Sequence, residues 1–101
     1  MPAYVILLRE EPVHTPEEMQ EYLRKGQLKP PPATLLPLAV YGAMTPLEGE
    51  LPDGAVILQF PSVDDAKAWY FSEHYQDASQ HRRASAPYRA FIVEGFEPPA
   101  A

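Results

Sequence analysis

Alternating apolar positions mark three extended segments of the chain. They are residues 3–10 (AYVILLRE), 55–60 (AVILQF) and 88–95 (YRAFIVEG). In the first segment the two faces are Ala3, Val5 and Leu7, and Tyr4, Ile6 and Leu8. A strand that is apolar on both faces is typically covered on both sides, so these segments predict three buried strands. Residues 35–41 predict a further strand, followed by a short extended piece at 44–48.

Start and stop signals place a first helix between the first two strands. Thr15 stands at the N-cap position, Pro16 at the first helical position and Glu18 where a capping box would close, so we expect a helix from Pro16 to about Gly26. Three consecutive prolines then exclude helix and favour a rigid, extended connector.

A second helix should begin after Ser62, whose side chain can cap it, and falter near Ser72, a possible second cap. It should resume through Tyr75 to about Ser85, before Pro87 stops it. Three consecutive aromatics lie in this region, and successive helical residues point about 100° apart. The projection therefore places Tyr70 in the core, Trp69 at the core margin or on a pocket wall, and Phe71 outside.

The predicted order β-α-β-β-α-β indicates the α+β class and a ferredoxin-like split βαβ sandwich. Its antiparallel four-stranded sheet would carry two helices on one face. We expect a single domain over residues 1–96 and a frayed tail over 97–101. The helix-free face would expose more apolar surface than soluble monomers usually tolerate. A second copy packed sheet to sheet is the simplest cover, so the sequence predicts a homodimer.

Composition narrows the set of partners. With 101 residues, a formal net charge of -6 and a pI of about 4.9, the chain is not expected to bind nucleic acid or a membrane surface. It has no cysteine, which excludes disulfides and thiolate chemistry. The start of the chain has no basic region before its apolar run, and we expect a cytoplasmic location.

Several motifs resemble one family. They are AYVI at 3–6, LEG at 47–49, FPSVDDAKAWYFSEHYQ at 60–76 and IVEG at 92–95. Together they are similar to the domain of unknown function thirteen-thirty family of the dimeric α+β barrel superfamily. The resemblance implies a ferredoxin-like dimer with a pocket between sheet and helices, but no defined activity. The chain departs from the family pattern at GQLKPPPATLLP, so the rim of the pocket should differ.

Arg82 shares a helix face with Tyr75 and Ala78, a position patterned for the interior. A buried charge must be paired or face a cavity. The alternatives are an ion pair with a strand carboxylate such as Glu94, a stem lying along apolar surface with its head in water, or an anchor for an anion or enolate in a pocket. The resemblance also implies arginine at this position.

The histidines carry weaker signals. His74 and His81 are seven residues apart, about 10.5 Å along a helix, which is too far for an easy shared metal site, and we expect no metal and no cofactor. His14 precedes the Thr15 cap, where it can pack on Met19 or act at a pocket mouth.

Two functions remain open at this stage. One is a cofactor-independent enzyme of isomerase, cyclase or monooxygenase type, acting on a small carbonyl, lactone or phenolic acid. The other is a ligand-binding or accessory dimeric domain without turnover. The candidate catalytic residues are Arg82, Tyr75 and His14. The candidate substrate-binding residues are Trp69, Tyr70, Ser72 and Tyr4.

Overall fold

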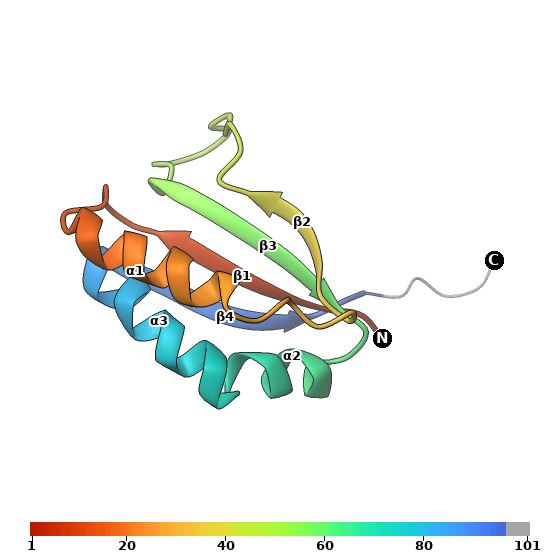
Figure 1. Cartoon of the computed structure of the whole chain (residues 1–101). Helices are drawn as coiled ribbons and strands as arrows, with labels where there is room; N and C mark the ends of the chain where they lie inside the picture. The colour runs from red at the N-terminus through yellow and green to blue at the C-terminus, as the bar shows by residue number, and fades with distance from the viewer. Residues whose placement is uncertain (97–101) are drawn as a thin grey trace.

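The computed structural model describes residues 1–96, which form four strands and three helices (Figure 1). The strands are β1 (Ala3–Arg9), β2 (Leu36–Val40), β3 (Gly54–Phe60) and β4 (Tyr88–Glu94). The helices are α1 (Pro16–Gln27), α2 (Val63–Tyr70) and α3 (Glu73–Ser85). The predicted order is confirmed, and the second helix is divided at the expected place. The predicted frayed tail, residues 97–101, lies outside the described residues.

The strands form one sheet in the order β2-β3-β1-β4, and every neighbouring pair is antiparallel. The helix α1 connects β1 to β2, yet β3 lies between these two strands, which is the split βαβ arrangement. A register shift between Pro37 and Ala39 interrupts the pairing of β2 with β3. The predicted α+β, ferredoxin-like fold is therefore confirmed.

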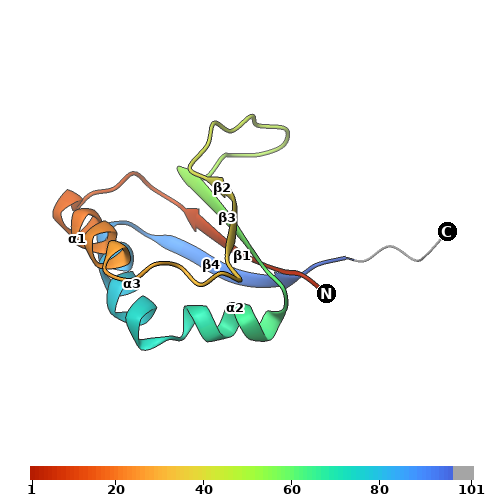
Figure 2. The same cartoon turned by 45° about the vertical axis from the view of Figure 1, so that its right-hand side comes forward.

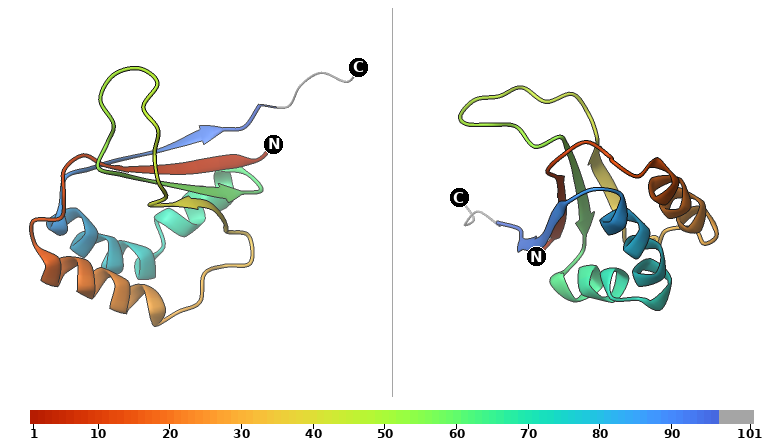
Figure 3. Two further views of the ribbon diagram at one scale, coloured as in Figure 1. Left: turned by 90° about the horizontal axis from the view of Figure 1, so that it is seen from above. Right: turned by 90° about the vertical axis from the view of Figure 1, so that its left-hand side faces the viewer.

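All three helices cover the same face of the sheet (Figure 3). On β1 the residues beneath the helices are buried, with Val5 only 1% exposed, whereas Ile6 on the opposite face is half-buried. The core is completed by Val56, Leu58 and Phe60 of β3, which alternate in the same way. The helix-covered face of the sheet thus supplies the hydrophobic core.

The helices approach the sheet to different degrees. The fully buried Ala66 lets α2 pack directly on β1, β3 and β4. The helix α1 instead packs along α3 and has no buried residue of its own. The large side chains of Tyr75 and Arg82 on α3 point inward and fill the layer between the α1–α3 pair and the sheet. The proline-rich connection from α1 to β2 runs past α2 to the edge of the sheet (Figure 2).

The opposite face of the sheet has no helix on it. Strand register places Ala39, Ile57, Ile6 and Phe91 in one row across all four strands on this face. The connection from β2 to β3, residues 41–53, leaves the sheet toward the same side (Figure 3). It contains the predicted extended piece at 44–48, which forms no strand, and its Leu47 is 92% exposed. This side of the molecule therefore presents a broad apolar surface.

The predicted capping box at α1 is wrong. Thr15 precedes the helix, but its side chain makes no capping hydrogen bond and instead pairs with Nδ1 of His14 at 2.9 Å. Glu18, the other member of the predicted box, contacts His81 of α3. By contrast, Oγ of Ser62 accepts a hydrogen bond from the Asp65 backbone N–H at 3.1 Å, as expected for a true N-cap.

Replacing Ser62 or Thr15 by alanine should therefore change the stability of the protein by different amounts. Ser62→Ala should lower the free energy of unfolding by about 1 kcal/mol, since a helical N–H loses its acceptor. Thr15→Ala should change it by less than about 0.5 kcal/mol, because no cap is lost. Urea denaturation followed by circular dichroism measures both. Equal losses in the two variants would contradict the assignment of the caps.

Candidate functional site

A cleft of about 570 Å³ lies between α1, the proline-rich connection and the helices α2 and α3. Its walls are largely apolar and include Leu23 of α1, the prolines at 30–32, Leu35 and Trp69. Small-molecule sites in proteins commonly occupy about 300–1,000 Å³ and are lined in this way. The cleft exists because α1 stands away from the sheet, so the fold itself provides room for a small ligand.

Two tyrosines on the wall of the cleft have paired hydroxyl groups. The hydroxyls of Tyr22 on α1 and Tyr75 on α3 lie 3.1 Å apart, and their rings meet edge to face. The Trp69 ring packs against Tyr75 with 4.0 Å between ring centres. Burial, with Tyr75 close by, raises the pKa of Tyr22 far above its usual value, so this phenol stays protonated and can donate a hydrogen bond.

Arg82 lies next to this tyrosine pair, one layer deeper than the cleft wall. The side chain is 1% exposed, and no residue within 1–96 accepts a hydrogen bond from its Nε, Nη1 or Nη2. Its Cζ lies 4.7 Å from the centre of the Tyr88 ring, which is a cation–π contact. Burial pulls the pKa of Arg82 down, but Tyr75 and Tyr22 raise it by more, so the guanidinium remains charged.

Both structural alternatives considered for Arg82 are wrong. Glu94 is exposed at the far end of β4 from Tyr88, and it forms no ion pair with Arg82. The guanidinium does not reach water either. The cleft is bounded by Trp69 and Tyr75 as predicted, but Arg82 is not itself on its wall.

A second tyrosine pair lies on the other side of Arg82. Tyr41, at the end of β2, and Tyr88, at the start of β4, place their hydroxyls 2.7 Å apart. The Arg9 guanidinium stacks on the Tyr41 ring at 4.7 Å and is held by Asp53 at 2.7 Å. Burial and the hydrogen bond to Tyr88 raise the pKa of Tyr41 well above its usual value. Two pairs of hydrogen-bonded tyrosines thus lie around one buried cation.

Two predicted substrate-binding residues have other roles in the structure. Ser72 lies on the cleft, but its Oγ accepts from the Tyr75 N–H and donates to the Trp69 carbonyl, so it caps α3. Tyr70 is half-buried beside a smaller cavity of about 290 Å³, bordered by α2 and β4. Phe71, predicted to lie outside the core, is 68% exposed.

Tyr4 and His14 are not brought to the cleft. Tyr4 lies opposite Val93 on the helix-free face of the sheet, so the sheet separates it from Tyr75 and Arg82. His14 is exposed in the loop before α1, where its backbone N–H donates to the Ser85 carbonyl. The structure therefore assembles Trp69, Tyr75 and Arg82 from the predicted set, without Tyr4 or His14.

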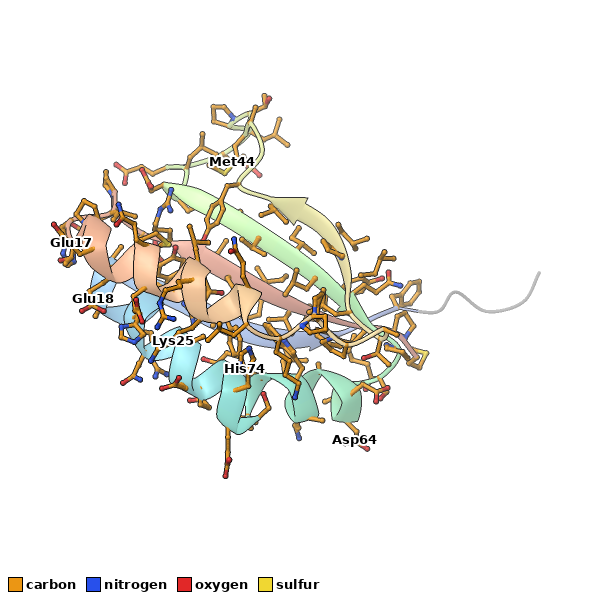
Figure 4. All side chains as sticks on the ribbon, in the orientation of Figure 1. Glu17, Glu18, Lys25, Met44, Asp64 and His74 are labelled. Carbon is orange, nitrogen blue, oxygen red and sulfur yellow. The ribbon has the colours of Figure 1, made fainter. Side chains whose placement is uncertain are left out.

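Sequence reasoning missed three tyrosines in this region, and it did not place His74 on the cleft. Tyr22, Tyr41 and Tyr88 each stand in a different element, and only the pairing of those elements brings their hydroxyls together. His74 lines the cleft between the end of α1 that carries Lys25 and the start of α3 (Figure 4). The proline-rich connection, predicted as a rigid connector, forms a wall. Its departure from the family pattern was the signal that predicted a different rim.

Neither a metal site nor a membrane-spanning helix is found in the part of the chain that the structure describes. Within residues 1–96 no group of three or more histidine, cysteine or acidic side chains is arranged to hold a metal ion. No helix in that range combines the length and apolar character needed to cross a bilayer. The cytoplasmic location stays a prediction.

Residues 2–96 match the family described as Domain of unknown function (DUF1330). No curated protein matches the chain. The sequence match therefore reaches across almost all of the described residues without bringing a characterised activity.

Solved structures share the fold at low identity. A protein of unknown function from Rhodopseudomonas palustris is 18% identical with a TM-score of 0.61, over 96% of this chain and 84% of that one. A dimeric, ferredoxin-like protein of unknown function from Bacteroides fragilis is 17% identical with a TM-score of 0.60, over 93% and 96%. An ethyl tert-butyl ether d family protein from Bacillus halodurans is 12% identical with a TM-score of 0.61, over 95% and 100%. These likenesses confirm the fold alone.

Proposed function

The chain belongs to the DUF1330 family, and from this premise we propose that it binds a small carbonyl, lactone or phenolic compound in the cleft between α1 and α3. The observation that carries the proposal is the cleft itself. Its largely apolar walls include Tyr22 and Tyr75, whose hydroxyls lie 3.1 Å apart. An apolar body with a polar oxygen at one end fits such a site.

The enzymatic form of the proposal is proton transfer without a cofactor. A carbonyl oxygen at the tyrosine pair would accept hydrogen bonds from Tyr22 and Tyr75, and the nearby Arg82 charge would favour the enolate that forms when a neighbouring carbon loses its proton. His74 lines the same cleft and could take that proton and return it to a different carbon. The net change is an isomerisation, in which no atom is gained or lost.

The second candidate is a binding or accessory domain without turnover. It is favoured by the roles that Ser72 and His14 have in the structure, since neither is available as a catalytic group in the cleft. The two candidates are separated by incubating the protein with a carbonyl compound in deuterated water. The measurement is whether deuterium from the solvent replaces protons of the compound. Exchange that depends on His74 supports the enzyme, whereas tight binding with no exchange supports the binding domain.

We also propose that the protein is a homodimer formed by the helix-free faces of two sheets. The row of Ala39, Ile57, Ile6 and Phe91 would become the centre of this interface. The Bacteroides fragilis neighbour is described as dimeric, which supports the proposal. A self-complementary contact between two copies of one sheet face is the usual geometry of a two-fold dimer.

Filling the cleft should weaken ligand binding. Ala68 is exposed on the cleft wall, and Ala68→Leu should lower affinity by about tenfold or more, because the larger side chain occupies ligand space. Ala84→Leu is the matched control on an exposed turn of α3 outside the cleft. Native mass spectrometry of freshly purified protein identifies a retained ligand, and calorimetry measures its affinity. Equal affinities in both variants would place the ligand elsewhere.

A further inference from the structure

The guanidinium of Arg82 is the least compensated group in the described structure. Its three nitrogens are buried without a hydrogen-bond acceptor, while the side chain is 1% exposed. Within residues 1–96 the arginine and lysine side chains that form ion pairs lie nearer the surface; Arg9, for example, is paired with Asp53. Burying a charge that lacks a partner is strongly unfavourable, so other interactions must offset the cost of burying Arg82.

The tyrosines around Arg82 favour its charged form, but within residues 1–96 no group accepts a hydrogen bond from its three nitrogens. The Tyr88 ring offers a cation–π contact, but the hydroxyls of the two tyrosine pairs bond each other. A phenol hydroxyl that rotates away from its neighbour can donate to an anion placed beside the guanidinium. Tyr22 and Tyr75 line the cleft and Arg82 does not, so a ligand in the cleft reaches the cation only if this pair moves apart.

On the side of Arg82 away from the cleft, the backbone has an unusual geometry. Tyr41 has φ of 51°, a left-handed conformation that non-glycine residues rarely adopt and that often marks a functional position. Its ring lies directly on Gly54, where an added Cβ would come within 2.7 Å of Tyr41 Cδ1. The strained backbone and the bare glycine hold Tyr41 against Tyr88, and together they close the cluster on the side away from the cleft.

We propose that Arg82 and the surrounding tyrosines form the anion-binding end of the cleft, and that the ligand is a small monoanion carrying a carboxylate or an enolate. This inference rests on the proposed function, because it assumes that the cleft holds the rest of the ligand. A carboxylate matches the planar fork of the guanidinium with two parallel hydrogen bonds. The remaining oxygen lone pairs can accept from Tyr22 and Tyr75. The apolar remainder of the ligand would lie along Trp69.

A single negative charge suits the site better than a phosphate does. The cluster contains one unpaired cation, because Arg9 is already neutralised by Asp53. The nearby phenols can donate hydrogen bonds but carry no positive charge. A dianion would therefore bring one uncompensated charge into a buried site, which is costly.

The test compares a charged ligand with a neutral one of nearly the same shape. Phenylacetate and phenylacetamide, with a short series of other aromatic and aliphatic acids and their amides, are titrated into the full-length wild-type protein by calorimetry at pH 7. Arg82→Met removes the cation at similar volume, and Arg83→Met is the matched control, since Arg83 is exposed on the next position of α3. Wild-type protein should prefer acids over amides by about ten- to a hundredfold.

Loss of that preference in Arg82→Met, with its retention in Arg83→Met, supports the proposal. The free Arg82→Met protein should stay folded, because methionine fills a similar volume and no hydrogen bond to the guanidinium is lost. Equal binding of acids and amides to wild type overturns the anion site while leaving the proposed cleft function in place. Failure of every acid and amide to bind also overturns the anion site, whereas the proposed function is tested separately by the retained ligand and the Ala68→Leu variant. If Arg82→Met fails to fold, the preference of wild type alone still decides the outcome.

Discussion

Ile57→Glu is expected to convert the proposed homodimer into a monomer. Ile57 lies in the middle of the apolar row on the helix-free face, opposite Ile6 on β1 and Ala39 on β2. In a two-fold interface each copy contributes the same residue, so the substitution places two unpaired carboxylates in one apolar contact. Burying such charges is costly, and the dissociation constant of the dimer should rise by at least about a hundredfold.

Sedimentation velocity at micromolar concentration measures this change. In the free monomer the new glutamate faces water, so the fold should be retained, which circular dichroism can check. Leu28→Glu is the control, because Leu28 is 68% exposed just after α1 on the helix side of the molecule. A wild-type protein that sediments as a monomer, or an Ile57→Glu variant that stays dimeric, would reject this interface.

Gly54→Ala is expected to lower the free energy of unfolding by about 1–3 kcal/mol, as is typical of an overfilled interior. The new Cβ would lie 2.7 Å from Cδ1 of the Tyr41 ring and 3.4 Å from Nη2 of Arg9. The ring cannot simply move aside, since its hydroxyl bonds Tyr88 and its backbone N–H donates to Ala55 at 2.8 Å. The alanine should therefore displace Tyr41 from Tyr88.

Gly42→Ala provides the control, because Gly42 lies at the other end of the connection from β2 to β3. Nothing lies within 4 Å of a Cβ added at Gly42, so its stability should be unchanged or slightly higher. Thermal unfolding followed by circular dichroism compares the two variants. If Tyr41 closes the anion end of the cleft, Gly54→Ala should also reduce the preference for acids over amides. Equal stability of both glycine variants would show that the Tyr41 ring is not confined.

Much of the fold could be predicted because its signals are local. Each of the strands β1, β3 and β4 is apolar on both faces, and this alternation follows from strand geometry without knowledge of any partner. The break between α2 and α3 was also predictable, since the Ser72 side chain caps α3 within three residues of itself. The order of these elements then left few topologies, and the ferredoxin-like sheet is one of them.

The cap at Thr15 shows where local signals fail. The residues at Thr15, Pro16 and Glu18 fit the pattern of a capping box, yet Thr15 pairs with His14 and Glu18 pairs with His81. The second pairing joins residues 63 positions apart. A helix projection also placed Tyr75 and Arg82 on one interior face correctly, but it could not tell whether Arg82 had a partner.

The sequence by itself determined the elements, the family and the inward direction of Arg82, because each depends on residues that are neighbours in the chain. Only the tertiary structure decided what surrounds Arg82. Tyr22 meets Tyr75 across two helices, and Tyr41 meets Tyr88 across the sheet, 47 positions apart in the chain. Contacts between side chains so far apart are fixed by strand register and by the distance at which α1 and α3 pack, and neither quantity is encoded in any short stretch of sequence.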